Sequence, residues 1–262
     1  MTVTLVTVTL AILLIAMLVP WGWAFWCKKY SFAQFLLWSI AWLLTRCLWQ
    51  ARGPRRLPVP DGQSCVIVCN HRSSIDPFFL QVMADRPIHW MVAREYCEHP
   101  AFRWFLRTCE VIPVNRGGID TAATKLAIRL LREGGRVGMF PEGRINMSDE
   151  FMMPVRPGAA LIALRAGVPI LPCCILGSPY RRVPWSPFLM RARVEIRFGE
   201  LIDLSQYADR ADEDELPGKI MLDVCRRLAS LADQNKFHPQ LAGRRWKPTA
   251  EELAGGSPGG HD

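Results

Sequence analysis

The chain of 262 residues is half apolar and carries a formal net charge of +8, with a pI near 9.2. This length accommodates one large domain plus a shorter segment, and the charge favours anionic partners such as phosphate groups or acidic lipid headgroups. The basic residues are scattered rather than gathered in one stripe, so we expect no nucleic acid partner. The nine cysteines form no Cys-x-x-Cys pair, which predicts a reducing compartment with neither a disulfide framework nor a metal site.

Two apolar runs open the chain. Residues 1–27 contain no charged side chain and would form a helix of about 40 Å, enough to cross a bilayer core of about 30 Å. Residues 30–45 would give only about 24 Å of helix. Either the first helix spans the membrane, with Lys28 and Lys29 on the cytoplasmic side and the second helix along the surface, or both form a hairpin in one leaflet.

A cleaved signal peptide is the alternative interpretation of this segment. Residues 1–27 lack a basic start and a small-residue cleavage site, and a second apolar run follows. We therefore expect residues 1–50 to be a retained membrane anchor of one or two helices. The domain that follows is expected on the cytoplasmic face of the membrane, which is the inner membrane if the protein is bacterial.

Residues 51–63 form a basic linker rich in proline and glycine, and residues 241–262 are expected to be a disordered tail. Between them, short apolar runs alternate with helical patterns, which predicts an α/β domain over residues 64–240 with a mixed, mostly parallel sheet flanked by helices. The expected strands cover residues 65–69, 88–93, 111–114, 136–140, 168–176 and 194–198, the last as an edge strand. The expected helices cover residues 122–132, 157–166 and 216–237, and an earlier helix is expected to begin at Pro77.

Residues 70–77 connect the first strand to the first helix of this domain, and ligands bind at this end of the strands in α/β sheets. Asp76 occupies a position suited to a helix N-cap, with Pro77 at the first helical position. In one interpretation Asp76 caps the helix and His71 is a solvated loop residue. In the other, Asp76 accepts a hydrogen bond from one ring nitrogen of His71 and leaves the other nitrogen as a base.

Three further stretches place polar residues or a proline beside apolar strands. Residues 111–118 lead into Arg116 and two glycines, residues 140–144 contain Glu142, Gly143 and Arg144, and residues 168–170 place a proline in a buried strand. The guanidinium group matches phosphate oxygens, and Glu142 is expected to orient Arg116 or Arg144. Together with residues 70–77, these strand ends predict a site for a substrate that carries a phosphate and a hydroxyl to be deprotonated.

The same four blocks carry a resemblance to a known family. They read Asn-His-Arg-Ser-Ser-Ile-Asp-Pro, Ile-Pro-Val-Asn-Arg, Phe-Pro-Glu-Gly-Arg and Val-Pro-Ile, in this order, within residues 64–176. The chain thereby resembles the glycerolipid acyltransferases, whose best-known members are the 1-acyl-glycerol-3-phosphate (lysophosphatidic acid) acyltransferases.

The resemblance implies an enzyme that transfers an acyl chain directly, with His71 as general base and Asp76 as the residue that orients it. Arg116, Glu142, Gly143 and Arg144 would bind the phosphate of the acceptor. The expected partners are a lipid membrane, a lysophospholipid acceptor and a thioester donor, either acyl-CoA or acyl-acyl carrier protein. The resemblance implies no metal and no further cofactor.

One departure from the family pattern concerns the third block. Family members more often have a threonine between the glycine and the arginine, whereas Arg144 directly follows Gly143 here. Glycerol-3-phosphate, lysophosphatidylethanolamine and ornithine lipids therefore stay open as acceptors beside 1-acyl-glycerol-3-phosphate. Two rivals of other classes are a hydrolase that uses His71 and Asp76 as metal ligands and a non-catalytic lipid-binding membrane protein.

Overall fold

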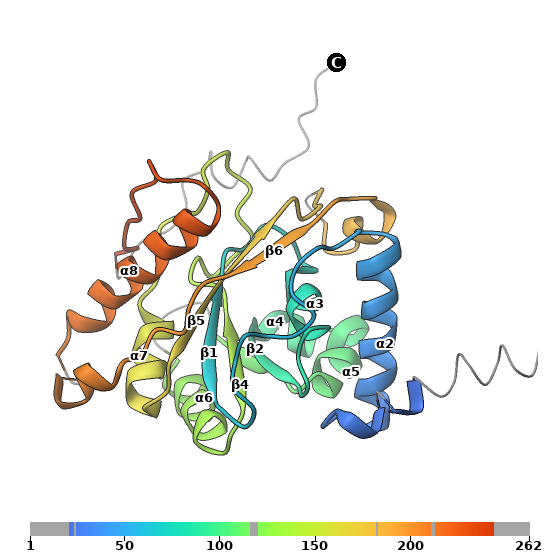
Figure 1. Cartoon of the computed structure of the whole chain (residues 1–262), viewed down its shortest axis with the longest axis horizontal. Helices are drawn as coiled ribbons and strands as arrows, with labels where there is room; N and C mark the ends of the chain where they lie inside the picture. Colours follow the sequence, from blue (N-terminus) through green and yellow to red (C-terminus); the bar gives the residue numbers. More distant parts are fainter. Residues whose placement is uncertain (1–20, 24, 116–119, 182, 211–212, 244–262) are drawn as a thin grey trace, which may run out of the picture.

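One six-stranded sheet organises the fold. The computed structural model describes residues 21–23, 25–115, 120–181, 183–210 and 213–243 (Figure 1). In space the strands follow the order β3-β2-β4-β1-β5-β6. Neighbouring strands from β3 to β5 run parallel, and β6 is antiparallel to β5, so the predicted mixed, mostly parallel sheet is confirmed. The strands are β1 (Cys65–Cys69), β2 (Ile88–Ala93), β3 (Ile112–Val114), β4 (Arg136–Met139), β5 (Ile170–Leu176) and β6 (Glu195–Phe198).

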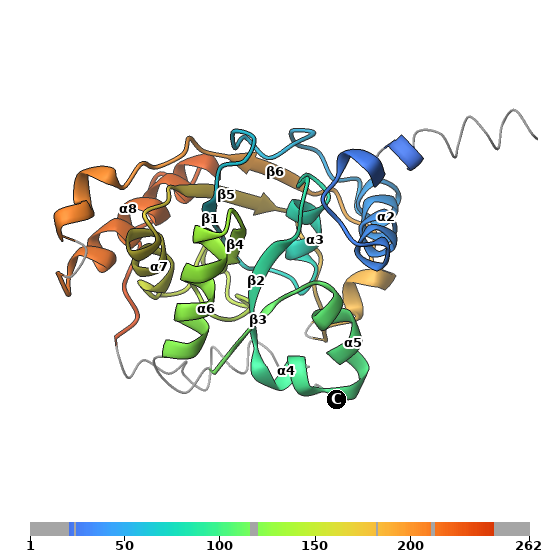
Figure 2. The same cartoon turned by 90° about the horizontal axis from the view of Figure 1, so that it is seen from below.

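Helices cover both faces of this sheet (Figures 1 and 2). One face packs against α6 (Thr121–Arg132), α7 (Gly158–Ala166) and α8 (Leu216–Leu231). The other face packs against α3 (Asp76–Gln81), with α2 (Phe32–Cys47) outside α3. The remaining helical segments are α4 (Arg94–Glu98), α5 (Pro100–Thr108) and the 3₁₀ turns η1 (Ser186–Leu189) and η2 (Ser205–Arg210).

The central strand β1 shows why the sheet needs two helical layers. Val66 and Val68 pack into the α6–α8 layer, whereas Ile67 and Cys69 pack toward α3, and all four side chains are fully buried. A parallel strand covered on both faces is apolar at every position, as the sequence of β1 is. Because β1 to β5 run the same way, their carboxyl ends, and the loops that follow them, lie at one edge of the sheet.

Most predicted elements are confirmed within two residues. The strands over residues 65–69 and 88–93 match to the residue, and the predicted helix over residues 216–237 ends early, at Leu231. It ends there because the backbone turns at Asp233, whose φ is +59°. The sequence did not predict α4 and α5. Neither helix has a buried side chain, and α4, with five residues, is too short to show a helical pattern.

Helix α2 falls on the second apolar run and packs on the domain. Phe35, Trp38, Ala41 and Thr45 are buried, and Trp38 Nε1 donates to the carbonyl of Val82 at 3.3 Å. Within the described ranges no helix combines the length and the apolar character needed to cross a bilayer.

The two ends of the chain are only partly described. Residues 1–20, most of the first apolar run, lie outside the described residues, so the expected membrane anchor stays a prediction. The same is true of residues 244–262 in the expected tail, while Leu241 at its start pairs with Val155.

Candidate active site

The loop between β1 and α3 brings His71 and Asp76 together. His71 Nδ1 lies 3.0 Å from Asp76 Oδ2, the Asp76 side chain is fully buried, and the His71 side chain is 15% exposed. When the imidazole is neutral and donates from Nδ1 to the carboxylate, Nε2 keeps its lone pair as a proton acceptor. Of the two interpretations of this loop, the geometry matches an oriented imidazole.

The backbone of the same loop fixes Asp76. The amides of Arg72 and Ser73 both donate to Asp76 Oδ2 at 2.8 Å. The predicted N-cap role of Asp76 is therefore wrong. Ile75 is the N-cap of α3 and Asp76 is the first helical residue, with its carboxylate directed back at the loop. Two amide donors and the imidazole use the lone pairs that a capping side chain would offer to the helix.

One face of the imidazole packs on a stack of aromatic rings. The His71 and Phe140 rings have centroids 3.9 Å apart with planes inclined by 10°, and Phe140 stacks on Trp90 at 4.8 Å and 14°. Trp90 comes from β2 and occupies the space above Gly138 in β4, where a Cβ atom would lie 2.5 Å from the indole. Strands β2 and β4 thus determine the height and tilt of the His71 ring.

Glu142 lies beneath the His71 loop and is 1% exposed. Its carboxylate accepts from the amide of His71 at 2.8 Å and from the amide of Met153 at 2.9 Å. Burial raises the pKa of Glu142 to about 8, against the effect of the two amide donors, which favour the charged form. Both oxygens of this predicted substrate-binding residue are thus used to join two backbone segments.

The other predicted binding residues follow β3 and β4. Gly143 adopts a φ of +71°, a conformation that other residues rarely adopt, and this turn leads into the half-buried Arg144. Arg116 lies outside the described residues, in the segment between Asn115 and Asp120. The structure therefore brings His71, Asp76 and Glu142 into direct contact and leaves the placement of Arg116 untested.

Sequence reasoning missed several residues that bind this loop. The side chain of Asn70 pairs with both the amide and the carbonyl of Ile175 in β5, at 2.8 and 2.9 Å. The backbone amide of Asn146 donates to the carbonyl of His71 at 2.7 Å. Ser178 donates its hydroxyl to Asp76 Oδ1 at 2.5 Å. Asn70 and Ser178 follow the buried strands β1 and β5 closely, which is the signal that could have found them. Asn146 carries no such signal.

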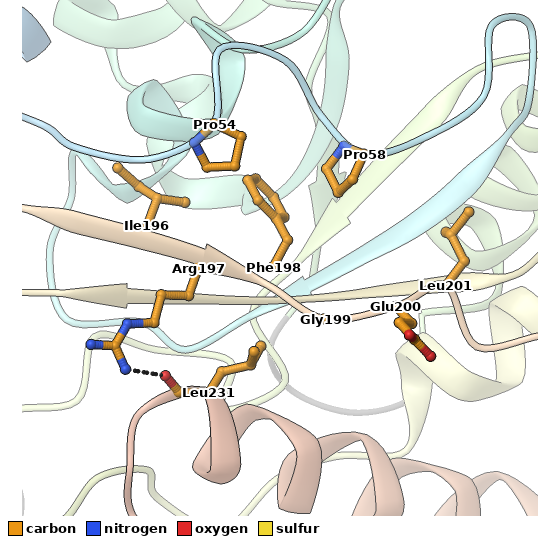
Figure 3. Close-up of a pocket in the computed structure, with 9 residues that line it drawn as sticks. All are labelled: Pro54, Pro58, Ile196, Arg197, Phe198, Gly199, Glu200, Leu201 and Leu231. Carbon is orange, nitrogen blue, oxygen red and sulfur yellow. Dashed lines mark hydrogen bonds between the residues drawn. The ribbon is translucent and has the colours of Figure 1, made fainter.

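A shallow apolar groove lies elsewhere on the domain (Figure 3). Its walls come from the linker, β6 and the end of α8. Phe198 in this groove pairs with Cys173 in the middle of β5, and Cys173 pairs in turn with Cys69 at the end of β1. None of the residues that line this groove is a candidate site residue. The lining residues are Pro54, Pro58, Ile196, Arg197, Phe198, Gly199, Glu200, Leu201 and Leu231.

The described site residues form no cluster of metal ligands. In the part of the chain that the structure describes, no three His, Cys, Asp or Glu side chains are grouped in a way that could hold a metal ion. The two residues considered as metal ligands, His71 and Asp76, are joined to each other by a hydrogen bond. Asp76 also accepts hydrogen bonds from two backbone amides. Such a saturated carboxylate fits an orienting role better than ligation.

Known proteins resemble this chain in sequence. The family model described as Acyltransferase matches residues 50–176. The chain is 29% identical over 180 residues to a 1-acyl-sn-glycerol-3-phosphate acyltransferase of Streptococcus pneumoniae, covering 65% of this chain and 64% of that protein. It is 26% identical over 159 residues to the Bacillus subtilis protein of the same name, covering 60% of this chain and 76% of that protein. The match thus spans less than two thirds of the streptococcal relative.

A solved structure resembles the fold as well. It is the crystal structure of the 1-acyl-sn-glycerophosphate (LPA) acyltransferase PlsC from Thermotoga maritima, with a TM-score of 0.56 and 20% sequence identity. The superposition covers 88% of this chain and 97% of that chain. At this identity the likeness shows a shared fold.

Proposed function

We propose that this chain, whose residues 50–176 match the acyltransferase family model, transfers a fatty acyl chain to a lysophospholipid. The proposed acceptor is 1-acyl-glycerol-3-phosphate, the substrate in the names of both relatives, and the product is phosphatidic acid. The observation that supports this chemistry best is the 3.0 Å contact between His71 Nδ1 and Asp76 Oδ2, beside a partly exposed imidazole.

His71 is the proposed general base. Its Nε2 removes the proton from the free hydroxyl of the acceptor, and the hydroxyl oxygen attacks the thioester carbonyl carbon. The new C–O bond forms, the C–S bond breaks as the tetrahedral intermediate collapses, and the imidazolium returns its proton to the leaving thiolate. The negative charge of Asp76 stabilises the imidazolium and keeps Nε2 directed at the acceptor.

The proposed phosphate-binding residues are Arg116 and Arg144. Both follow strands whose carboxyl ends lie at the same edge of the sheet as His71, and guanidinium groups bind phosphate through two parallel hydrogen bonds. Gly143 allows the turn that leads into Arg144. For Glu142 we propose a role through the backbone, because its two oxygens accept from the amides of His71 and Met153.

The proposed donor is an acyl thioester, either acyl-CoA or acyl-acyl carrier protein. A general base and an activated thioester are sufficient for this reaction, so the proposal includes no cofactor. The two donors share the carbonyl that is attacked and differ in the carrier beyond the sulfur atom. A comparison of rates with the two donors identifies the carrier.

The proposed location is the cytoplasmic face of a membrane. Phe32, Leu36, Ile40 and Leu43 of α2 are between 48% and 69% exposed and form one stripe at helical spacing, opposite the buried Thr45. Large exposed apolar stripes mark interaction surfaces, and Phe and Leu suit the boundary between headgroups and acyl chains.

A second exposed apolar segment continues from the end of α2. In and beside η1, Trp185 is 60% and Leu189 is 77% exposed. This segment is joined to α2 through Trp49, whose Nε1 donates to the carbonyl of Pro187 at 2.9 Å. Phe188 contacts Phe78 in α3, the helix that begins at Asp76. We define residues 185–189 and the exposed stripe of α2 as the apolar surface and propose that it contacts the bilayer beside the active site.

The experiment that tests the function uses the full chain in liposomes with a labelled acyl-CoA or acyl-acyl carrier protein. Each donor is offered with 1-acyl-glycerol-3-phosphate, glycerol-3-phosphate, lysophosphatidylethanolamine or an ornithine lipid. The proposal expects the fastest acylation with 1-acyl-glycerol-3-phosphate and the same rate in a chelator. A higher rate with another acceptor would correct the substrate. No acylation of any acceptor would contradict the function and leave the lipid-binding alternative.

A further inference from the structure

We propose that Ser178 is a positioning residue for the reaction at His71: its hydroxyl holds one carboxylate oxygen of Asp76, so that the other oxygen stays directed at the imidazole. The proposal rests on the proposed acyl transfer. Ser178 lies outside the four sequence blocks and beyond the family match, which ends at residue 176.

The two oxygens of Asp76 have different partners. Oδ2 accepts from His71 Nδ1 and from the amides of Arg72 and Ser73. Oδ1 accepts from the Ser178 hydroxyl at 2.5 Å, and no other donor to Oδ1 is found among the described residues. The side chain is fully buried, so water cannot replace a missing donor at low cost. Ser178 is thus the one donor to Oδ1 among the described residues.

The end of β5 positions Ser178 beside Asp76. Asn70 pairs with the backbone of Ile175 and joins the end of β5 to the start of the His71 loop. Gly177 then turns the chain with a φ of +74°, and a Cβ atom there would lie 2.4 Å from the carbonyl oxygen of Arg193. Because only glycine fits this close approach, the turn is specified, and the residue after it faces Asp76.

Two other hydroxyls connect the same segments without touching the carboxylate. Ser73 donates to the carbonyl of Pro179 at 2.6 Å, and Ser74 donates to the carbonyl of Pro184 at 2.7 Å. Three side-chain hydrogen bonds thus join the segment after β5 to residues 70–77, and of these only the bond from Ser178 reaches the carboxylate of Asp76. Ser74 is therefore a matched control that separates attachment of the loop from orientation of the carboxylate.

Loss of the Ser178 hydroxyl should affect the chemical step more than substrate binding. Without a donor on Oδ1, the carboxylate is held at Oδ2 alone and its plane can tilt, so the imidazole spends less time with Nε2 directed at the acceptor. A buried hydrogen bond to a charged group corresponds to roughly a tenfold change or more in an equilibrium or a rate. Ser178 touches neither substrate in this proposal, so KM should stay within about twofold of the wild-type value while kcat falls.

The test measures kcat and KM for the acceptor with the full chain in liposomes, for the wild type, Ser178→Ala, Ser178→Thr and Ser74→Ala, after thermal melting has verified that each variant is folded. We expect kcat to fall about tenfold in Ser178→Ala at unchanged KM. Ser178→Thr retains the hydroxyl, and Ser178 is only half-buried, so we expect this variant to recover most of the wild-type kcat. Ser74→Ala should keep the wild-type kcat.

Each outcome decides the proposal. A wild-type kcat in Ser178→Ala would overturn it, and so would an equal loss in Ser74→Ala, because attachment of the loop would then explain the effect. A failure of Ser178→Thr to recover activity would also contradict a role for the hydroxyl. A wild-type protein that acylates no acceptor would overturn the proposed function itself, a result distinct from the failure of Ser178 alone.

Discussion

The imidazole of His71 lies parallel to the phenyl ring of Phe140, with ring centroids 3.9 Å apart and planes inclined by 10°. Asp76 fixes one edge of the imidazole through Nδ1, and Phe140 fixes its plane. A ring held both at an edge and on a face has little freedom to rotate. This preorganisation is what a general base needs, because a small misplacement lowers the rate of proton transfer steeply.

Replacement of Phe140 tests the contribution of the stack. Phe140→Leu removes the aromatic face, and we expect kcat to fall by a factor of about 2–10, since an aromatic pair contributes about 0.5–1.5 kcal/mol beyond its buried area. Phe140→Tyr retains the ring and should keep most of the activity. Equal kcat values for the leucine and wild-type proteins in the liposome assay would rule out a role for the stack.

Gly138 provides the space for the ring at the base of this stack. Gly138→Ala would place a Cβ atom 2.5 Å from Trp90, and we expect a lower melting temperature, corresponding to about 1–3 kcal/mol of lost stability. Gly158→Ala is the matched control. The added Cβ atom there would lie 3.7 Å from Met139, an ordinary contact, at the start of a helix. Melting curves that rank the two variants in the opposite order would contradict this account.

The contrast between β1 and the His71 loop shows what sequence patterns can predict. The apolar run of residues 65–69 predicts a buried strand because a parallel strand between two helical layers has no polar position. The pairing of His71 with Asp76 was also predictable, because the two residues are close in sequence. Local rules failed on Asp76 as an N-cap, since its carboxylate binds the preceding backbone and a serine 102 residues away.

Glu142 and Ser178 mark the limit of that reasoning. Glu142 was expected to orient Arg116 or Arg144, and the family resemblance implied that it helps to bind the phosphate of the acceptor. The structure places its carboxylate under the His71 backbone, and this position depends on how β4 and the segment before α7 meet. Ser178 reaches Asp76 only because β5 pairs with β1. Neither contact is encoded by spacing along the chain.

The raised pKa of Glu142 predicts a pH dependence of stability. Between the ordinary carboxyl pKa of 4.5 and about 8, the folded protein holds a proton on Glu142 that the unfolded chain has lost. The stabilisation is therefore complete below pH 4.5 and is lost as the pH rises toward 8, by up to about 1.4 kcal/mol per pH unit.

Thermal melting of Glu142→Gln measures this contribution. The amide of the variant does not ionise, so its melting temperature should fall less than that of the wild type as the pH is raised from 5 to 8 within the window that the raised pKa defines. Parallel profiles for the two proteins would show that Glu142 takes up no proton on folding.

The apolar surface predicts a dependence on how the acceptor is presented. Leu189 is 77% exposed, and Leu189→Asp should weaken contact with a bilayer, because insertion of a leucine side chain is worth about 1.5–3 kcal/mol. We expect a higher apparent KM, by about tenfold, for an acceptor embedded in vesicles. The rate with a short-chain acceptor dissolved in water should not change.

Leu241→Asp provides the control for this substitution. Leu241 is 42% exposed but lies beside α8 rather than on the apolar surface. Its replacement should leave the apparent KM for the vesicle-borne acceptor unchanged. If Leu189→Asp lowers the rate equally with both forms of the acceptor, its effect arises within the domain and not at the bilayer.

The most direct test of the central claim is the rate of phosphatidic acid formation by wild type, His71→Asn and His99→Asn under identical conditions. His99 is an exposed histidine that caps α5, and asparagine preserves a cap, so His99→Asn should match the wild type. If His71 is the general base, His71→Asn should be slower by a factor of about 10²–10⁴ while it stays folded. A folded His71→Asn protein that forms phosphatidic acid at the wild-type rate would contradict the mechanism.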